Sequence, residues 1–264
     1  MPKLAANLSM MFQEVGFLDR FEAAAAAGFT AVEYLFPYDF PAADIAARLK
    51  RHGLTQALFN MPPGDWAKGE RGTTALPGRE REFEAGLKQA IEYAVALDCR
   101  RIHPMAGNWP AGRDRAEGRR VYAGNLRRAA DLAAEHEIAV LIEPINTRDM
   151  PSYFLNTTGE AIAVIDEVGR PNVKLQLDLY HCQIMEGDLA AHVRALAGRY
   201  THVQIAGVPA RHEPDRGEVN YPYLLELLDE IGYDGWVGLE YRPAAETRAG
   251  LGWARRWGVV PKGA

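Results

Sequence analysis

This sequence of 264 residues has few cysteines and no long apolar run, and each absence narrows the class of protein. Its two cysteines, Cys99 and Cys182, are too few for a disulfide framework or a paired thiolate metal site, so we expect free thiols in a reducing compartment. No run of about 18 apolar residues occurs, which predicts no membrane span. The first residues, MPKLAANLSMM, lack the apolar stretch and cleavage site of a signal peptide. We therefore expect a cytoplasmic protein with no membrane partner.

Basic charge is also scarce. The chain has 30 Lys and Arg residues against 35 Asp and Glu residues, a formal net charge of −5. Because nucleic-acid surfaces are normally basic, this balance predicts no nucleic-acid partner. Two catalytic signatures are missing as well. No Gly-rich turn of a dinucleotide-binding fold follows the first predicted strand, and Ser9 does not stand in the G-x-S-x-G turn of a serine hydrolase.

The sequence does have a regular alternation of short apolar runs and longer stretches with helical spacing. The predicted strands are Leu4–Leu8, Thr30–Leu35, Thr55–Asn60, Arg101–Met105, Ala139–Glu143, Val173–Asp178, Thr201–Ile205 and Trp236–Glu240. The predicted helices span residues 17–27, 41–52, 80–97, 115–136, 158–168, 188–198, 221–231 and 247–257. Eight strand–helix units without a linker predict a single α/β domain over residues 1–264, a (β/α)₈ TIM barrel. A doubly wound open sheet is the main alternative.

Two of the predicted strand-to-helix connections are long. One covers residues 60–80 and the other residues 206–222, and both contain several Gly and Pro residues. Loops of this length in a compact domain usually serve as lids or binding loops, although surface decoration is the simpler alternative. Both follow the carboxyl ends of strands, where barrel enzymes place their active sites.

Oxygen-bearing side chains end or nearly end four consecutive predicted strands. They are Glu143, Asp178, Gln204 and Glu240, and the spacings of 35, 26 and 36 residues each correspond to about one strand–helix unit. A single carboxylate at a strand end is more often a helix cap or an ion-pair partner. Three converging carboxylates, however, would repel one another without a counter-charge. Hard oxygen donors favour Mg²⁺ or Mn²⁺, so these four residues are the predicted ligands of one divalent metal.

Further polar residues are expected at the same mouth of the barrel and are candidates for substrate binding. His103 ends the fourth strand, and His181 follows Asp178 by three residues, so that a turn would direct it into the same cavity. Asn7 and Asn60 end the first and third strands, although Asn is also an ordinary turn residue there.

One divalent cation with oxygen ligands is suited to polarising a carbonyl and an adjacent hydroxyl group of the same substrate. This acidifies the C–H bond beside the carbonyl and stabilises the enediolate that forms when the proton leaves. Proton transfer then needs two groups that flank neighbouring carbons. Glu143 and Glu240 are the candidates for this acid–base pair.

Long segments of the chain resemble the hydroxypyruvate isomerase family, within the larger group of xylose isomerase-like barrels. They run from residue 3 to residue 257 and include AANLSMMF, EYLFPYDF, PPGDWAKGERG, LPGRE, LIEPIN, QLDLYHCQIMEG, HVQIAGVPARHEPDRGEVNYPYL and GWVGLEYRP. The resemblance implies a (β/α)₈ barrel that interconverts hydroxypyruvate and 2-hydroxy-3-oxopropanoate (tartronate semialdehyde), an aldose–ketose type isomerisation. It also implies that Glu143 and Glu240 are the proton donor and acceptor.

The resemblance also bears on the remaining site residues. In the larger group a Glu, an Asp, a His and a Glu hold the metal, so Gln204 at the third position departs from the pattern. His181 matches a histidine that contacts substrate in related epimerases. Arg211 corresponds only approximately to an arginine that follows the third ligand, and it is a further candidate for substrate binding. The substrates are 2-oxo acids, so a cation besides the metal is expected, and the sequence does not select one among the arginines.

Several rival functions remain open at this point. A 2-oxo-tetronate isomerase shares AANLSMMF, LPGRE and HVQIAG with this chain, whereas DWAKGERG, IEPIN and the IMEG after His181 favour hydroxypyruvate isomerase. A ketose C3 epimerase would use the same two carboxylates. A metal-dependent DNA-repair nuclease would need many histidine ligands and a basic groove, and a ligand-binding barrel without activity would be expected to lack one of the two glutamates. The sequence leaves both a monomer and a homo-oligomer open.

Overall fold

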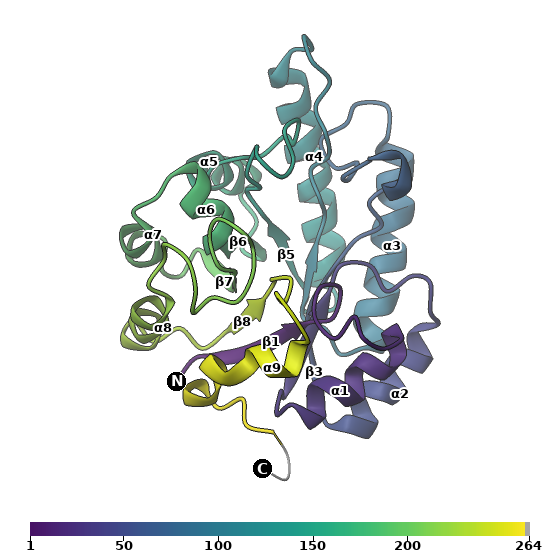
Figure 1. Ribbon diagram of the computed structural model, residues 1–264. Helices are drawn as coiled ribbons and strands as arrows, with labels where there is room; N and C mark the ends of the chain where they lie inside the picture. Colours follow the sequence, from purple (N-terminus) through teal and green to yellow (C-terminus); the bar gives the residue numbers. More distant parts are fainter. Residues whose placement is uncertain (262–264) are drawn as a thin grey trace.

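In a computed structural model that describes residues 1–261, the chain forms a closed barrel whose eight strands follow one another in sequence order (Figure 1). Every neighbouring pair is parallel, including β1 with β8. The strands are β1 (Lys3–Asn7), β2 (Ala31–Tyr34), β3 (Thr55–Asn60), β4 (Arg101–His103), β5 (Ala139–Ile142), β6 (Val173–Asp178), β7 (Tyr200–Ile205) and β8 (Trp236–Leu239). The predicted (β/α)₈ barrel is therefore confirmed, and the doubly wound alternative is excluded because the sheet is closed.

Helices connect successive strands around the outside of the barrel (Figure 1). They are α1 (Arg20–Ala26), α2 (Ala42–His52), α3 (Glu80–Ala96), α4 (Arg115–Ala134), α5 (Thr158–Val168), α6 (Leu179–Met185), α7 (Leu189–Ala195), α8 (Tyr221–Glu230) and α9 (Thr247–Gly250). Short 3₁₀ helices lie at Phe17–Asp19, Trp66–Lys68 and Leu251–Trp257. No helix among residues 1–261 has the combination of length and apolar character that a membrane crossing requires.

The helical predictions differ from the structure in two places. The last predicted helix, 247–257, is one short α-helical turn followed by a 3₁₀ segment, and Gly250 and Gly252 in this stretch lower its α-helical propensity. The helix α6 was not predicted. It begins directly after β6 because Asp178, the last residue of that strand, caps it by accepting hydrogen bonds from the backbone N–H groups of Tyr180 and His181.

The barrel interior contains a small apolar cluster toward its amino-terminal end. There Ala5, Ala31 and Ala57 form a small cluster of their own, against which Trp236 packs. Further along the strands the buried side chains become polar and include Glu33, Gln176, His202 and Gln204. The large apolar core lies outside this layer, between the strands and the helices. This polar layer therefore lies directly below any site at the carboxyl ends of the strands.

Both long predicted connections are held in place by contacts within the connection, and the first also contacts the segment after β4. In the connection after β3, Glu70 pairs with Arg79 at 2.8 Å, and Gly72 forms an antiparallel bridge with Ala106. In the connection after β7, Arg211 adopts a left-handed backbone conformation with φ of 57°. Its N–H group donates to the carbonyl oxygen of Gly207 at 2.7 Å. These contacts give each connection a defined path beside the mouth.

Candidate active site

Three of the predicted metal ligands converge at the carboxyl ends of β5, β6 and β8. Glu143, Asp178 and Glu240 each place a carboxylate oxygen, and His181 a ring nitrogen, so that all four atoms lie within 4.8 Å of one another. All four side chains are buried. The separation of the two glutamates is one that a substrate of three or four carbon atoms can bridge.

His181 reaches this group because of the way in which α6 begins. Asp178 uses Oδ1 to cap the helix, which leaves its Oδ2 facing the site, 3.6 Å from His181 Nε2. The other ring nitrogen, Nδ1, lies 2.6 Å from the side-chain amide of Asn146, a contact that fixes the orientation of the ring. The cap thus orients the carboxylate and the imidazole together.

Arg211 supplies the counter-charge to this group. Its Nη2 lies 2.7 Å from Glu240 Oε2 and 3.9 Å from Asp178 Oδ2, and its Nη1 lies 3.3 Å from Asp149 Oδ2. The guanidinium group also stacks on Tyr180, 4.8 Å from the ring centre. Burial alone would lower the pKa of Arg211, but Glu240 and Asp178 outweigh it and raise the pKa. The charge of Arg211 is therefore committed to the carboxylates of the protein.

One arginine does not offset three buried carboxylates. Burial, together with Glu240 and Asp178, raises the pKa of Glu143 well above its ordinary value. Burial raises the pKa of Glu240 to about 8, although Arg211 opposes the shift. Burial also raises the pKa of Asp178. The site thus favours either protonated carboxyl groups or a bound cation.

Two oxygen atoms of the group fit a cation directly. Glu143 Oε1 and Asp178 Oδ2 are buried and have no hydrogen-bond partner among the described residues. Unsatisfied buried carboxylate oxygens are costly, and a divalent ion satisfies several at once. The residues present therefore fit a hard divalent metal.

Gln204, the fourth predicted ligand, lies next to Asp178 in the register of β6 and β7. Its side-chain N–H donates to Glu33 Oε1 at 2.8 Å, and its oxygen accepts from the amide of Gln176 at 2.6 Å. Both ends of the amide are thus engaged in the polar layer below the carboxylates. Its coordination of a metal stays a prediction.

The other predicted substrate-binding residues line the same mouth. His103 is fully buried, its Nδ1 lies 3.5 Å from Glu143 Oε2, and burial lowers its pKa to about 3, so the ring is neutral. Asn60 stands beside His103 in the register of β3 and β4. Asn7 donates through Nδ2 to Glu33 Oε1 at 3.0 Å and lies 3.4 Å from Glu240 Oε1.

The sequence did not predict that Glu33 and His202 form a pair below the site residues. Glu33 Oε2 lies 2.6 Å from His202 Nε2, and both side chains are buried. Gly238 makes room for the carboxylate, because a Cβ at that position would lie 2.3 Å from Glu33 Oε2. The sequence showed only a carboxylate inside an apolar strand and a histidine 169 residues later, and no local pattern joined the two.

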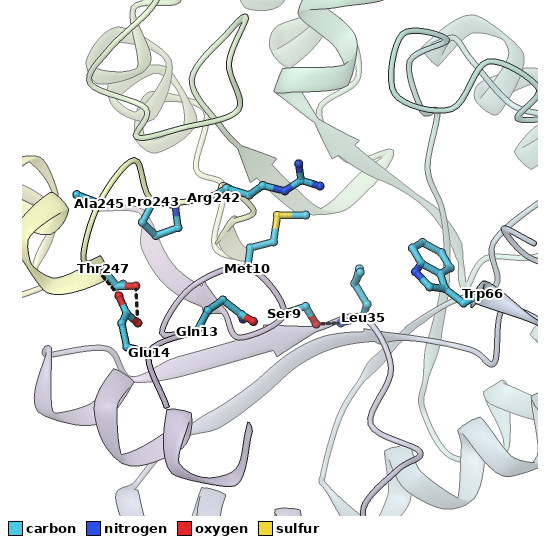
Figure 2. A pocket seen from close by; sticks show the side chains of 10 residues that line it. All are labelled: Ser9, Met10, Gln13, Glu14, Leu35, Trp66, Arg242, Pro243, Ala245 and Thr247. Carbon is cyan, nitrogen blue, oxygen red and sulfur yellow. Dashed lines mark hydrogen bonds between the residues drawn. The ribbon is translucent and has the colours of Figure 1, made fainter. Parts of the chain in front are cut away.

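An open pocket of about 490 Å³ is lined in part by residues that follow the ends of β1 and β8 (Figure 2). Its lining includes Ser9, Gln13, Trp66 and Arg242. Ser9 follows Asn7 by two residues, and Arg242 follows Glu240 by two residues. Two residues of the pocket lining are therefore close in the chain to residues of the site. Trp66 comes from the long connection after β3.

Comparison with known proteins places this geometry in context. The sequence model of a protein family described as "Xylose isomerase-like TIM barrel" matches residues 21–257. The chain is 59% identical over 255 residues to 2-oxo-tetronate isomerase from Cupriavidus necator, which covers 97% of this chain and 98% of that protein. It is 45% identical over 253 residues to hydroxypyruvate isomerase from Escherichia coli, with coverage of 96% and 98%. A crystal structure described as AP endonuclease, family 2, from Brucella melitensis superposes with a TM-score of 0.96 at 56% identity, covering 97% of this chain and 99% of that one.

Proposed function

Because this chain belongs to the xylose isomerase-like TIM barrel family, we propose that it is an isomerase that converts a 3-hydroxy-2-oxo acid into the 2-hydroxy-3-oxo acid. Hydroxypyruvate and 2-oxo-tetronate both belong to this substrate class, and in both the reaction moves a proton from C3 to C2. They differ only in the hydroxymethyl group that 2-oxo-tetronate carries on C3. The observation that carries the proposal is the convergence of Glu143 and Glu240 with Asp178 and His181.

The two glutamates divide the proton transfer between them. One carboxylate takes the proton from C3, which leaves an enediolate across C2 and C3. The hydroxyl proton passes from O3 to O2, and the other carboxylate delivers a proton to C2. Burial raises the pKa of Glu143 well above its ordinary value and that of Glu240 to about 8, so both carboxyl groups hold a proton more readily than exposed ones. The reaction is reversible, so each glutamate is donor in one direction and acceptor in the other.

Neighbouring residues hold these glutamates and the substrate in place. Arg211 keeps Glu240 aligned at 2.7 Å, and Asn7 lies beside the other oxygen of the same carboxylate. Neutral His103 stands beside Glu143, where its ring can donate a hydrogen bond without adding charge. The burial of Glu143, Asp178 and Glu240 supports a site in which little water reaches the enediolate.

A divalent metal is part of the proposal. Mg²⁺ or Mn²⁺ held by Glu143, Asp178 and Glu240, with His181 or Gln204 as a further donor, would polarise the substrate carbonyl and offset the charge of the enediolate. The two unsatisfied oxygens of Glu143 and Asp178 support this assignment.

The names of the similar proteins bear on which of the two acids is the better substrate. The sequence segments favoured hydroxypyruvate, whereas the relative with 59% identity is named 2-oxo-tetronate isomerase and the one with 45% identity is named hydroxypyruvate isomerase. We propose 2-oxo-tetronate as the better substrate and hydroxypyruvate as the poorer one. Purified protein assayed by NMR on both acids, with and without a chelator, tests this. A kcat/KM for hydroxypyruvate above that for 2-oxo-tetronate would reverse the order.

The same assay separates the rival activities. A C3 epimerase would invert a neutral ketose and ignore both acids. The nuclease named for the Brucella melitensis structure would cut DNA that contains abasic sites. Three carboxylates and one imidazole in the clustered group weigh against a nuclease site rich in histidine ligands.

A further inference from the structure

A 2-oxo acid brings a carboxylate of its own into a site that already holds three. Arg211 is committed to Glu240, Asp178 and Asp149. With a divalent ion bound, the ion and Arg211 together would only balance Glu143, Asp178 and Glu240. The C1 carboxylate of the substrate therefore needs another cation, close to the site but outside this group.

Among residues 1–261, Arg242 is the one Lys or Arg that lines the 490 Å³ pocket. Its side chain is exposed and pairs with no carboxylate among residues 1–261. Figure 2 shows it extending from the segment after β8 above Met10, toward the side of the pocket where Trp66 lies. A guanidinium group in this position is free to take a carboxylate through two parallel hydrogen bonds.

The backbone of Arg242 is fixed although its side chain is free. Its N–H donates to the carbonyl oxygen of Arg211 at 2.8 Å, and its own carbonyl oxygen lies 2.7 Å from His212 Nδ1. These contacts join the segment after β8 to the connection after β7. They set the position of Arg242 relative to the Arg211–Glu240 pair.

The remaining polar groups of the pocket are compatible with an anion. Glu14, the one carboxylate among the described residues that line the pocket, is held at the far side, where it accepts from the N–H of Thr247 at 2.6 Å (Figure 2). Ser9 Oγ accepts from the N–H of Leu35 at 2.8 Å, which leaves its hydroxyl hydrogen free to donate.

Arg71, which lies beside the pocket residue Trp66, is less available than Arg242. Arg71 stacks on Trp66, 3.8 Å from the ring centre, and its Nη1 donates to the carbonyl oxygens of Trp66 and Glu70. It does not line the pocket. Its contacts hold the side chain of Trp66 in place in the lining of the pocket.

We propose that Arg242 binds the C1 carboxylate of the 2-oxo acid substrate and thereby selects acids over neutral ketoses of the same length. This rests on the isomerase function proposed above. Arg242 is on this basis a specificity residue, because the proton transfer itself belongs to Glu143 and Glu240.

The test compares Arg242→Gln with the wild type on matched acid and neutral substrates. Erythrulose and dihydroxyacetone carry a hydroxymethyl group where 2-oxo-tetronate and hydroxypyruvate carry the carboxylate. We expect Arg242→Gln to raise KM for the acids by about 10- to 100-fold, the range for losing hydrogen bonds to a charged group, with a much smaller effect on kcat. Proton exchange into the neutral ketoses from D₂O should stay at the wild-type rate. Arg242→Lys should recover part of the affinity, because it keeps the charge without the planar fork.

Arg248→Gln is the matched control. Arg248 is an exposed arginine on the adjacent α9 and does not line the pocket, so its loss removes the same charge without touching the proposed contact. An equal rise in KM for both variants would show a general field effect and overturn the proposal. An unchanged KM for Arg242→Gln in an active enzyme would do the same.

Calorimetric titration with hydroxypyruvate separates this inference from the isomerase function. If the wild type binds the acid without isomerising it and Arg242→Gln loses that binding, the carboxylate contact stands and the proposed reaction fails. If the wild type isomerises the acid and Arg242→Gln binds it equally well, the reaction stands and the contact fails. If the wild type neither binds nor isomerises either acid, both fail.

Discussion

Replacing Gly238 by alanine tests whether the buried pair of Glu33 and His202 supports the site. A Cβ at residue 238 would lie 2.3 to 2.5 Å from the carboxylate atoms of Glu33, so this carboxylate must move. It would then lose hydrogen bonds from Asn7 at 3.0 Å and Gln204 at 2.8 Å and its contact with His202 at 2.6 Å.

The expected cost follows from the burial of these groups. Losing the hydrogen bonds of a buried polar group costs about 1–3 kcal/mol, and for a chain of this size each kcal/mol lowers the Tm by about 2–4 °C. Gly238→Ala should therefore lower the Tm by about 2 to 12 °C. The isomerase kcat should fall as well, because Asn7 lies between Glu33 and Glu240. Calorimetric melting and steady-state kinetics measure the two effects.

Two further variants make the test specific. Gly124 lies inside α4 with open space where a Cβ would stand, so Gly124→Ala should raise stability by about 0.5–1 kcal/mol. In Gly238→Ala combined with Glu33→Ala the clash is absent, so the double variant should be less destabilised than the sum of the single variants. Additive losses, or a Gly238→Ala protein that melts with the wild type, would refute the supporting role of the pair.

Three further predictions follow from the site and the core. Glu143→Gln and Glu240→Gln should each lower kcat by at least about 100-fold with little change in Tm, and near-wild-type turnover in either variant would remove that residue from the proton transfer. Gln204→Ala should weaken Mn²⁺ binding about tenfold by calorimetry, whereas unchanged affinity would leave the ion to the other residues of the group. Burial raises the pKa of Cys99 and Cys182 to about 12, so neither thiol should react with Ellman's reagent at pH 8 until the protein unfolds, and rapid labelling of the native protein would contradict this.

The sequence predicted the barrel well because its signal is local and repeated. Each apolar run marks a strand, and the polar residue that ends the run marks the mouth, so Glu143, Asp178 and Glu240 could be placed together before any coordinates. The parallel strands of a closed barrel all end on one side. Residues that end successive strands are therefore close in space although they are far apart in the sequence.

The features that the sequence did not predict depend on contacts between distant strands or on the direction of a side chain. The sequence predicts a turn after the strand that ends at Asp178, whereas the structure has a helix at Leu179–Met185 that Asp178 caps. The pairing of Glu33 with His202 spans the barrel interior. Gln204 was expected to face a metal, but whether its amide turns up or down depends on Gln176, which no pattern connects with it.

Arg211, which follows β7, offsets part of the negative charge at the mouth and also positions Arg242, which follows β8. Arg211 stands in a left-handed backbone conformation, which costs about 1 kcal/mol or more for a residue with a Cβ. The hydrogen bond from its N–H to Gly207 and its ion pairs with Glu240 and Asp149 offset this cost and hold the charge inside the site. Its carbonyl oxygen in turn anchors Arg242, whose charge stays outside. A substitution that relaxes the backbone at Arg211 should therefore disturb the acid–base pair and the recognition of the substrate carboxylate together, whereas Arg242→Gln should disturb recognition alone.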